Sequence, residues 1–325
     1  MTIIGYHASH EQFSPAELLE YVEAAERAGF EAAMCSDHFH PWTPDQGNSG
    51  FAWSWLGAAL QATQLSFGTV TTPGYRYHPA VLAQAAATLA SMYEGRFWLA
   101  VGSGEALNER VTGAHWPPKS ERNARLLECV EVMRALWDGE TVTHYGRVTV
   151  EQATLYTRPA ARPALFGAAL TPETARWMGG WADGLITTAQ PVAKLEQMVE
   201  AFRVDGAGKP LVMQVQLCLA DSDDAARQTA RQRWPLAPLA SDVLAELRLP
   251  EQFAATTHSV DEKSIGQHVV AYSDPRRLVE QLSEYVELGF ERIYIHHVGP
   301  DQRAFIEKFG ELVLPELRTV AAGGT

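Results

Sequence analysis

The sequence predicts an α/β protein built as a (β/α)8 TIM barrel, and three observations lead to this fold class. Short apolar runs alternate with amphipathic segments almost from the first residue, as parallel strands joined by crossover helices do. Polar side chains able to do chemistry directly follow some of these runs, as expected at the C-terminal mouth of a barrel. Eight runs qualify as strands, and they start at residues 3, 32, 66, 96, 164, 184, 211 and 293.

The first strand and helix illustrate the assignment. Residues 3–6 form the first apolar run. Ser14, Pro15 and Glu17 supply an N-cap hydroxyl, a proline at the first helical position and a carboxylate three residues after the cap, which predicts a helix start. Gly29 follows the last apolar position and is the natural terminator, because glycine adopts the left-handed conformation at little cost.

The later elements are assigned by the same periodicities. Further strands are expected at residues 32–36, 66–71, 96–101, 164–168, 184–188, 211–219 and 293–297. The clearest further helices are expected at residues 51–63, 79–93, 121–137, 275–288 and 302–317. Two segments interrupt the alternation. A hairpin excursion at about 142–157 alternates around Gly146, and a polar, irregular insertion at about 234–267 is of the kind that barrels place at the mouth.

Length and composition favour one domain spanning residues 1–325. A barrel of about 250 residues accepts insertions, so 325 residues need no second domain. The net charge of -13, with no basic stripe, argues against nucleic acid or an anionic membrane as a partner. No apolar run approaches the roughly 18 residues that a membrane span needs. The three cysteines form no CxxC pair, so we expect a cytoplasmic protein in a reducing compartment.

Two polar clusters at strand ends are the most informative features of the chain. Residues 35–42 read Cys-Ser-Asp-His-Phe-His-Pro-Trp and follow the expected second strand. Residues 101–109 read Val-Gly-Ser-Gly-Glu-Ala-Leu-Asn-Glu and follow the expected fourth strand. In a barrel both clusters would lie at the mouth, where barrel enzymes carry out their chemistry.

Together these clusters resemble the signature of the luciferase-like flavin and deazaflavin oxidoreductases. The similarity is greatest to the branch of glucose-6-phosphate dehydrogenases that use coenzyme F420, and it extends to residues 5–13, 76–81 and 272–275. The resemblance implies a β/α barrel with an insertion at the mouth, a bound flavin or deazaflavin, a small-molecule substrate and a homodimer. A metal is not implied.

The resemblance also implies roles for particular residues. His38 matches a histidine proposed to take the substrate hydroxyl proton, which suits an imidazole with an unperturbed pKa of about 6.5. Glu105 matches a carboxylate proposed to deliver a proton to the ring. Catalytic roles are therefore expected for His38, Glu105, Trp42 and Glu11. Cofactor contacts are expected from Asp37, Thr71, Ser103, Gly104, Asn108, Ala168, Ala169 and Thr171.

Three departures from the resembled branch influence the choice of substrate and cofactor. Gln190 and Gln267 stand where lysines would hold a sugar phosphate, so glucose-6-phosphate is not the expected substrate. The segment 68–73 is one residue shorter than in the deazaflavin enzymes. Leu170 and Thr171 replace a Gly-Gly pair beside which the long cofactor tail would pass, although Thr171 still starts a helix that could take a plain phosphate. These departures favour FMN, with F420 as the alternative.

The predicted function is that of an FMN-linked reductase or monooxygenase acting on a small organic substrate. The first alternative is an F420-dependent dehydrogenase of an alcohol or sugar. A non-catalytic flavin-binding protein is a second. A metal-dependent hydrolase using Asp37, His38 and His40 is a third, but no second cluster with ligand spacing completes its shell. For His7, His10 and His40 the expected role is structural, and only Trp42, Trp53 and Trp55 of the tryptophans are expected near the mouth.

Overall fold

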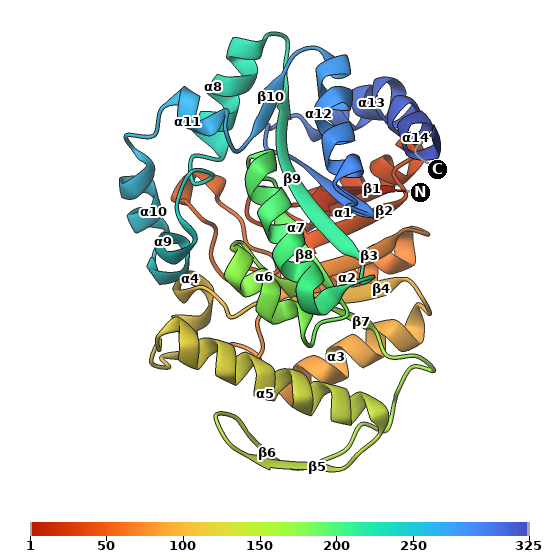
Figure 1. The fold of residues 1–325 in the computed structure, drawn as a ribbon, viewed down its shortest axis with the longest axis vertical. Coiled ribbons are helices and arrows are strands. Elements are labelled where there is room, and N and C mark those ends of the chain that lie inside the picture. The colour runs from red at the N-terminus through yellow and green to blue at the C-terminus, as the bar shows by residue number, and fades with distance from the viewer. Residues whose placement is uncertain (1, 324–325) are drawn as a thin grey trace.

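Eight parallel strands close into a barrel surrounded by helices in the computed structural model, which describes residues 2–323 (Figure 1). Strand β8 pairs with β9, which completes the ring and confirms the predicted fold class. The barrel strands are β1 Ile3–Ala8, β2 Ala32–Ser36, β3 Ser66–Thr71, β4 Phe97–Val101, β7 Ala164–Ala168, β8 Gly184–Thr188, β9 Leu211–Leu219 and β11 Arg292–His297.

The strands differ from expectation at two places, both near the C-terminal ends of barrel strands. β1 continues two residues further than expected, to Ala8, because His7 and Ala8 pair with Met34 and Cys35 of β2. A strand that was not predicted, β10 Val270–Tyr272, pairs with the end of β9 outside the closed ring. Three residues are too few for a recognisable period, so this pairing depends on the extension of β9 beyond the barrel.

Helices cover the outside of the barrel. The longer helices are α1 Pro15–Ala28, α2 Ala52–Ala62, α3 Pro79–Met92, α5 Lys119–Asp138, α6 Pro172–Gly179, α7 Val192–Gly206, α8 Asp223–Arg233, α12 Pro275–Glu287, α13 Gln302–Leu312 and α14 Leu314–Gly323. Helix α1 has the predicted ends: Ser14 and Glu17 form a capping box, and Gly29 has φ of 97°. The single helix expected at 302–317 is two helices, interrupted at Val313.

The hairpin lies at the edge of the molecule beside α5 (Figure 1). Its strands β5 Val142–Tyr145 and β6 Thr149–Ala153 pair antiparallel and are separate from the barrel sheet. Glu128 of α5 holds the hairpin, since its carboxylate accepts hydrogen bonds from His144 Nε2 at 3.0 Å and from the backbone N–H of Arg147 at 2.7 Å.

The insertion is more regular than the sequence indicates. It contains α9 Ser241–Glu246, α10 Pro250–Thr257 and α11 Glu262–Ile265, so the expectation of an irregular segment is wrong. These short helices pack on a small apolar cluster, which includes Trp234, Phe253 and Ile265 and is shared with α8 and the end of β9. Short helices of this kind are stabilised by tertiary packing, and their own periodicity is too brief to detect in the sequence.

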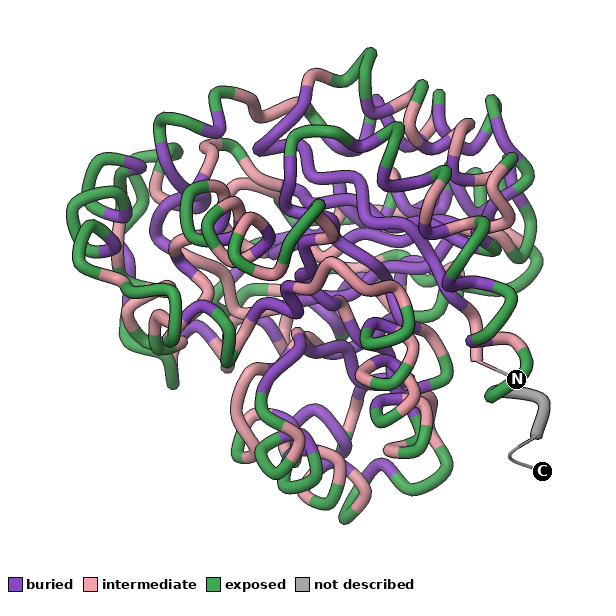
Figure 2. The backbone as a smooth tube through the Cα atoms, turned by 90° about the horizontal axis from the view of Figure 1, so that it is seen from above, coloured by how far each residue is buried: buried purple, intermediate pink, exposed green. Residues whose placement is uncertain are grey.

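The buried residues form two layers around the barrel wall. Figure 2 shows the buried backbone concentrated in the central strands, with exposed residues on the surrounding helices and loops. One layer lies between strands and helices, and a smaller cluster, which includes Trp98, Phe166 and Tyr294, fills the inside of the barrel. The barrel is therefore a packed core, and its open space lies at one end.

Candidate active site

A cavity of about 430 Å³ lies at the C-terminal ends of the barrel strands. Register explains its position: Ala8 pairs with Cys35 and Thr71 with Val101, so the loops after the first four strands emerge side by side. Its volume is within the range of small-molecule and cofactor sites. All twelve residues predicted from the sequence line this cavity: Glu11, Asp37, His38, Trp42, Thr71, Ser103, Gly104, Glu105, Asn108, Ala168, Ala169 and Thr171.

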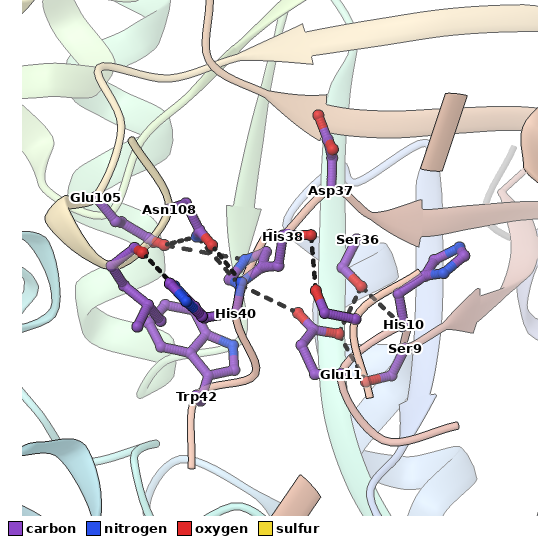
Figure 3. A network of polar contacts seen from close by, with 12 residues as sticks. Ser9, His10, Glu11, Ser36, Asp37, His38, His40, Trp42, Glu105 and Asn108 are labelled. Carbon is purple, nitrogen blue, oxygen red and sulfur yellow. Dashed lines mark hydrogen bonds and ion pairs between the residues drawn. The ribbon is translucent and has the colours of Figure 1, made fainter. Parts of the chain in front are cut away.

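Glu11 lies beneath His38 and is held by two hydroxyl groups (Figure 3). Its Oε2 accepts hydrogen bonds from Ser9 Oγ at 2.9 Å and from Ser36 Oγ at 2.5 Å. Its Oε1 is 3.6 Å from His38 Nδ1. Burial alone would raise the pKa of Glu11, but attraction to His38 and the Ser36 hydrogen bond bring it below its ordinary value. Glu11 is therefore a buried carboxylate placed to stabilise a positive charge on His38.

Asn108 and Glu105 approach His38 from the loop after β4, where α4 Ala106–Glu109 begins (Figure 3). Asn108 Oδ1 accepts the backbone N–H of Phe39 at 2.9 Å, so its Nδ2 is the donor that faces His38 Nδ1 at 3.1 Å. The same Nδ2 donates to Glu105 Oε2 at 3.2 Å. Since Nδ1 accepts a hydrogen bond, the neutral imidazole carries its proton on Nε2, which lies 3.9 Å from Glu105 Oε2.

The two carboxylates around His38 are in different environments. Burial raises the pKa of Glu105, and the attraction of His38 offsets only part of this effect. The pKa of Glu11 is shifted in the opposite direction. A pair of acids whose pKa values are moved apart is typical of sites that need one group to remain ionised and another to exchange a proton.

A second polar cluster lies around Asp37. Its Oδ2 accepts from Thr71 Oγ1 at 2.7 Å and its Oδ1 from Tyr77 Oη at 2.8 Å, while Arg76 Nη2 lies 3.2 Å from Oδ1. The backbone N–H of Arg76 also donates to Glu109 Oε2 at 3.0 Å. Burial raises the pKa of Glu109 to about 7, against the effect of Arg76. Asp37 and Arg76 thus join the loops that follow β2 and β3.

The glycine turn and the start of α6 form the opposite side of the cavity. Gly104 has φ of 84°, and a Cβ there would lie 2.9 Å from Thr72 Cγ2, so only glycine fits this position without strain. A Cβ at Gly102 would meet only the Ala168 side chain, at 3.7 Å. Thr171 is the predicted N-cap of α6, and its hydroxyl accepts the backbone N–H of Thr174.

Aromatic side chains contribute to the site differently than expected. Trp42 lies against His38, with ring centroids 4.8 Å apart, and lines the cavity as predicted. Trp53 and Trp55 do not line it, because they pack against Phe97 and Phe67 beneath α2. Their predicted place at the mouth is wrong. A residue that the sequence did not indicate, Trp234 of the insertion, lines the cavity instead.

The three histidines for which a structural role was expected have different surroundings. His40 Nδ1 bonds the Leu107 carbonyl oxygen at 2.9 Å, as expected of a structural residue. His10 packs edge-on against Trp55 outside the cavity lining, and neither of its ring nitrogens has a hydrogen-bond partner among the described residues. His7 lines the cavity, which the expectation of a purely structural role did not foresee. Its position became evident only from the two additional residues of β1.

Sequence reasoning also missed several lining residues. Two glutamines on β9 and two cations at the start of α5 had no motif to identify them: Gln214, Gln216, Lys119 and Arg122. Conversely, Gln190 and Gln267 do not line the cavity, and Gln190 instead contacts Met198 beneath β8. The inference against a sugar phosphate therefore cannot depend on these two positions.

Fold and site together define a β/α barrel whose mouth carries one wall formed by Glu11, His38, Glu105 and Asn108, called the acid–base wall below. Comparisons with known proteins give the class of protein. The sequence model described as Luciferase-like monooxygenase matches residues 2–292, and the chain belongs to this family. F420-dependent glucose-6-phosphate dehydrogenases of Nakamurella multipartita and Microbacterium testaceum are 38% and 37% identical, covering 98% and 97% of both chains. An F420-dependent secondary alcohol dehydrogenase in complex with an F420-acetone adduct superposes with a TM-score of 0.90 at 32% identity, covering 98% of this chain and 99% of that one.

Family membership decides between several of the predictions. The chain is an oxidoreductase of the luciferase-like, flavin- or F420-dependent type, which disfavours the hydrolase and the non-catalytic alternatives. The similar proteins named above are F420-dependent, so the comparisons favour F420 over the FMN that was preferred from the sequence. Within residues 2–323 no helix is long and apolar enough to cross a membrane.

Proposed function

We propose that this protein moves a hydride between a carbinol carbon of a small secondary alcohol, or the corresponding ketone, and the ring of coenzyme F420. The observation that carries this proposal is the placement of Glu11, Asn108 and Glu105 around His38 on one wall of the cavity. The names of the similar dehydrogenases support F420 and an alcohol or sugar as the reacting partners.

The lining of the cavity fits a planar ring with one polar edge. Met34, Val70, Ala168 and Ile186 give one side an apolar surface. The cofactor-binding residues predicted from the sequence would hold the ring between this surface and the acid–base wall. Beyond it, the N-terminus of α6 and Lys119, whose Nζ donates to Thr174 Oγ1 at 2.9 Å, offer positive charge to a phosphate of the tail. When bound, the deazaflavin would supply the hydride acceptor or donor.

The side chains of the acid–base wall would transfer a proton to or from the substrate oxygen. In the direction of ketone reduction, a doubly protonated His38 would give its Nε2 proton to the substrate oxygen and become neutral. In the direction of alcohol oxidation, a neutral His38 with its proton on Nδ1 would take the hydroxyl proton at Nε2 and become the imidazolium. A proton on Nδ1 requires Asn108 Nδ2, which faces this nitrogen at 3.1 Å, to turn away. The ionised Glu11 would stabilise the imidazolium in both directions, and Trp42 limits the positions that the His38 ring can adopt.

FMN remains a second candidate because two structural observations favour it. Leu170 lines the cavity beside Ala168 and Ala169, where the departure from a Gly-Gly pair would crowd a long tail. β3 keeps a regular parallel register with β4 up to Thr71, within the segment 68–73 that is one residue shorter than in the resembled deazaflavin enzymes. FMN has a short phosphate tail that needs only the start of α6.

Titration of the apoprotein with F420 and with FMN, followed by fluorescence, tests the cofactor. We expect micromolar or tighter binding of F420 and its reduction when propan-2-ol is added. Tight FMN binding without F420 binding would replace the main proposal by the second candidate. Reduction of neither ring by any secondary alcohol, with the ring bound, would contradict the proposed reaction.

A further inference from the structure

One side of the cavity carries polar groups that the proposed reaction does not use. His7 of β1 and Gln214 and Gln216 of β9 line it. Within the part of the chain that the structure describes, no hydrogen bond joins the His7 ring or the Gln216 side chain to another residue, and both residues line the cavity. Polar side chains that face a cavity without a protein partner are available to hydrogen-bond a ligand there.

These groups are held in place by a network at the floor of the cavity. Gln12 donates its Nε2 to the Val298 carbonyl oxygen at 3.0 Å, so its Oε1 accepts from His296 Nε2 at 2.7 Å. His296 Nδ1 then accepts from Gln214 Nε2 at 3.4 Å. The His296 ring also lies 4.7 Å from that of His7. Because this network orders Gln214 and His7, their remaining polar atoms are presented to the cavity in a defined arrangement.

The electrostatics around His7 and Glu11 disfavour an anionic ligand. Burial lowers the pKa of His7 to about 4, so its imidazole is neutral at pH 7. Glu11 nearby is ionised. Among the described residues that line the cavity, the lysine and arginine are Lys119 and Arg122, both of α5, and Arg122 is paired with Glu246. A phosphate or carboxylate placed beside His7 and Glu11 would meet a neutral imidazole and a negative charge.

Trp234 supplies an apolar surface next to these polar groups. Its ring packs edge-on against His296, with centroids 4.5 Å apart, and it lines the cavity. Leu236 and Leu244 of the insertion line the cavity as well. The combination of neutral hydrogen-bonding groups and an indole is typical of sites for uncharged molecules with hydroxyl groups on an apolar ring.

We propose that His7, Gln214 and Gln216 form a specificity subsite for a second, uncharged oxygen of the substrate, which makes the substrate a neutral diol or hydroxyketone. This inference rests on the proposed function, because it assigns the reacting oxygen to His38 and the second oxygen to the subsite. It goes beyond simple alcohols such as propan-2-ol, which have no group to reach these residues.

Isothermal titration calorimetry of the full chain with matched ring compounds tests the subsite. The probes are cyclohexanol, the 1,2-, 1,3- and 1,4-cyclohexanediols, and cyclohexyl phosphate, so that position and charge vary on one apolar frame. We expect at least one diol to bind about tenfold more tightly than cyclohexanol, and cyclohexyl phosphate to bind at least tenfold more weakly. One hydrogen bond to a buried group corresponds to roughly this factor.

Variants assign the effect to the subsite. Gln216→Leu should reduce the advantage of the diol over cyclohexanol about tenfold, and His7→Phe should reduce it similarly. Gln190→Leu is the matched control, because Gln190 is an equally buried glutamine that does not line the cavity. Circular dichroism checks folding, and His7→Phe carries the test if Gln216→Leu does not fold. No diol advantage in the wild type, or an advantage that persists in His7→Phe and in folded Gln216→Leu, would overturn the proposal.

The test of the subsite and the test of the hydride transfer can give different results. A diol advantage that depends on Gln216, without reduction of any ring, would support the subsite and contradict the hydride transfer. Oxidation of cyclohexanol as fast as of every diol, with equal affinities, would support the hydride transfer and overturn the subsite.

Discussion

The protonation of the His38 imidazole is influenced by three neighbouring side chains, each in a different way. Asn108 determines which ring nitrogen carries the proton in the neutral form, because its Oδ1 is already engaged by the backbone and only its Nδ2 can face the imidazole. Glu11 is kept ionised by hydroxyl groups, while Glu105 holds its proton more strongly than an ordinary glutamate. Protonation of His38 Nδ1 would exchange the hydrogen bond from Asn108 Nδ2 for an ion pair with Glu11 Oε1, which lies 3.6 Å from this nitrogen.

Replacement of His38 by alanine is expected to lower turnover about 10²–10⁴-fold, the usual contribution of a general acid or base. The affinity for the ring should change little, since the ring would be held mainly by other residues. Steady-state kinetics and a fluorescence titration measure the two quantities. His115→Ala is the control, because His115 is exposed and outside the cavity. Unchanged turnover in His38→Ala would remove the proposed acid–base residue.

Glu105→Gln should leave the fold intact and impair turnover or ring affinity. The amide keeps the shape of the side chain but cannot exchange a proton with the ring or with His38 Nε2, which lies 3.9 Å away. Single-turnover kinetics with the bound ring would show the loss, and circular dichroism would check the fold. Glu94→Gln on the surface serves as control. Wild-type kinetics and affinity in Glu105→Gln would contradict its role.

The loop from β4 to α4 shows how a short element sets the position of several functional groups. Gly104 reverses the chain in the left-handed region, after which Glu105 and Asn108 project toward His38. A side chain on Gly104 would displace this loop, because its Cβ would lie 2.9 Å from Thr72 and 3.0 Å from Glu109. The positions of Glu105 and Asn108 in the acid–base wall therefore depend on the backbone conformation of Gly104.

Gly104→Ala is expected to lower the free energy of unfolding by more than about 1 kcal/mol and to reduce turnover strongly. The backbone strain alone costs about 1 kcal/mol, and the overlap with neighbouring side chains adds to it. Gly113→Ala separates the two effects, since Gly113 has a similar φ of 79° and nothing within 4 Å of an added Cβ. Urea denaturation and kinetics measure both variants. Equal losses in the two variants would show that crowding at Gly104 has no role.

Four buried histidines make the whole molecule sensitive to acid. Burial lowers the pKa of His7 and His10 to about 4 and of His297 to about 3, and that of His296 falls well below its ordinary value. In the unfolded chain these groups titrate near 6.5, so below that pH the unfolded state binds more protons than the folded state. Their contribution to stability is therefore complete above about pH 6.5 and is lost as the pH falls toward 4.

We expect the free energy of unfolding to fall by about 1.4 kcal/mol per pH unit for each such histidine in this window. Urea denaturation at pH values between 7 and 4 measures the slope. His10→Phe removes one titrating group without touching the cavity lining, and it should make the slope shallower by that amount. An identical slope in His10→Phe and the wild type would contradict the assignment.

For the whole molecule, assembly into a homodimer is a prediction. It follows from the resemblance, and the exposed apolar side chains of Val81 and Met92 on α3 offer a surface on which it could form. Light scattering is expected to give twice the chain mass of 35.7 kDa. A mass of one chain at micromolar concentration would contradict the prediction.

Much of the fold follows from local signals that tertiary structure did not override. The eight strand positions come from short apolar runs, and the ends of α1 from Ser14, Glu17 and Gly29. β10 and the three insertion helices escaped detection because they are too short for a period of their own and are stabilised by neighbouring elements. The single-domain organisation was predicted from length and remains a prediction.

The sequence by itself determined the fold class, the family and the acid–base wall, because those residues lie in continuous motifs directly after strands. The tertiary structure alone decided which isolated residues join them. His7, Gln216 and Trp234 come from three distant segments without a shared motif, and only closure of the barrel and packing of the insertion bring them to one cavity. The same packing places Gln190 and Trp53 elsewhere, since strand register and side-chain direction, rather than proximity in sequence, determine which side chains reach the mouth.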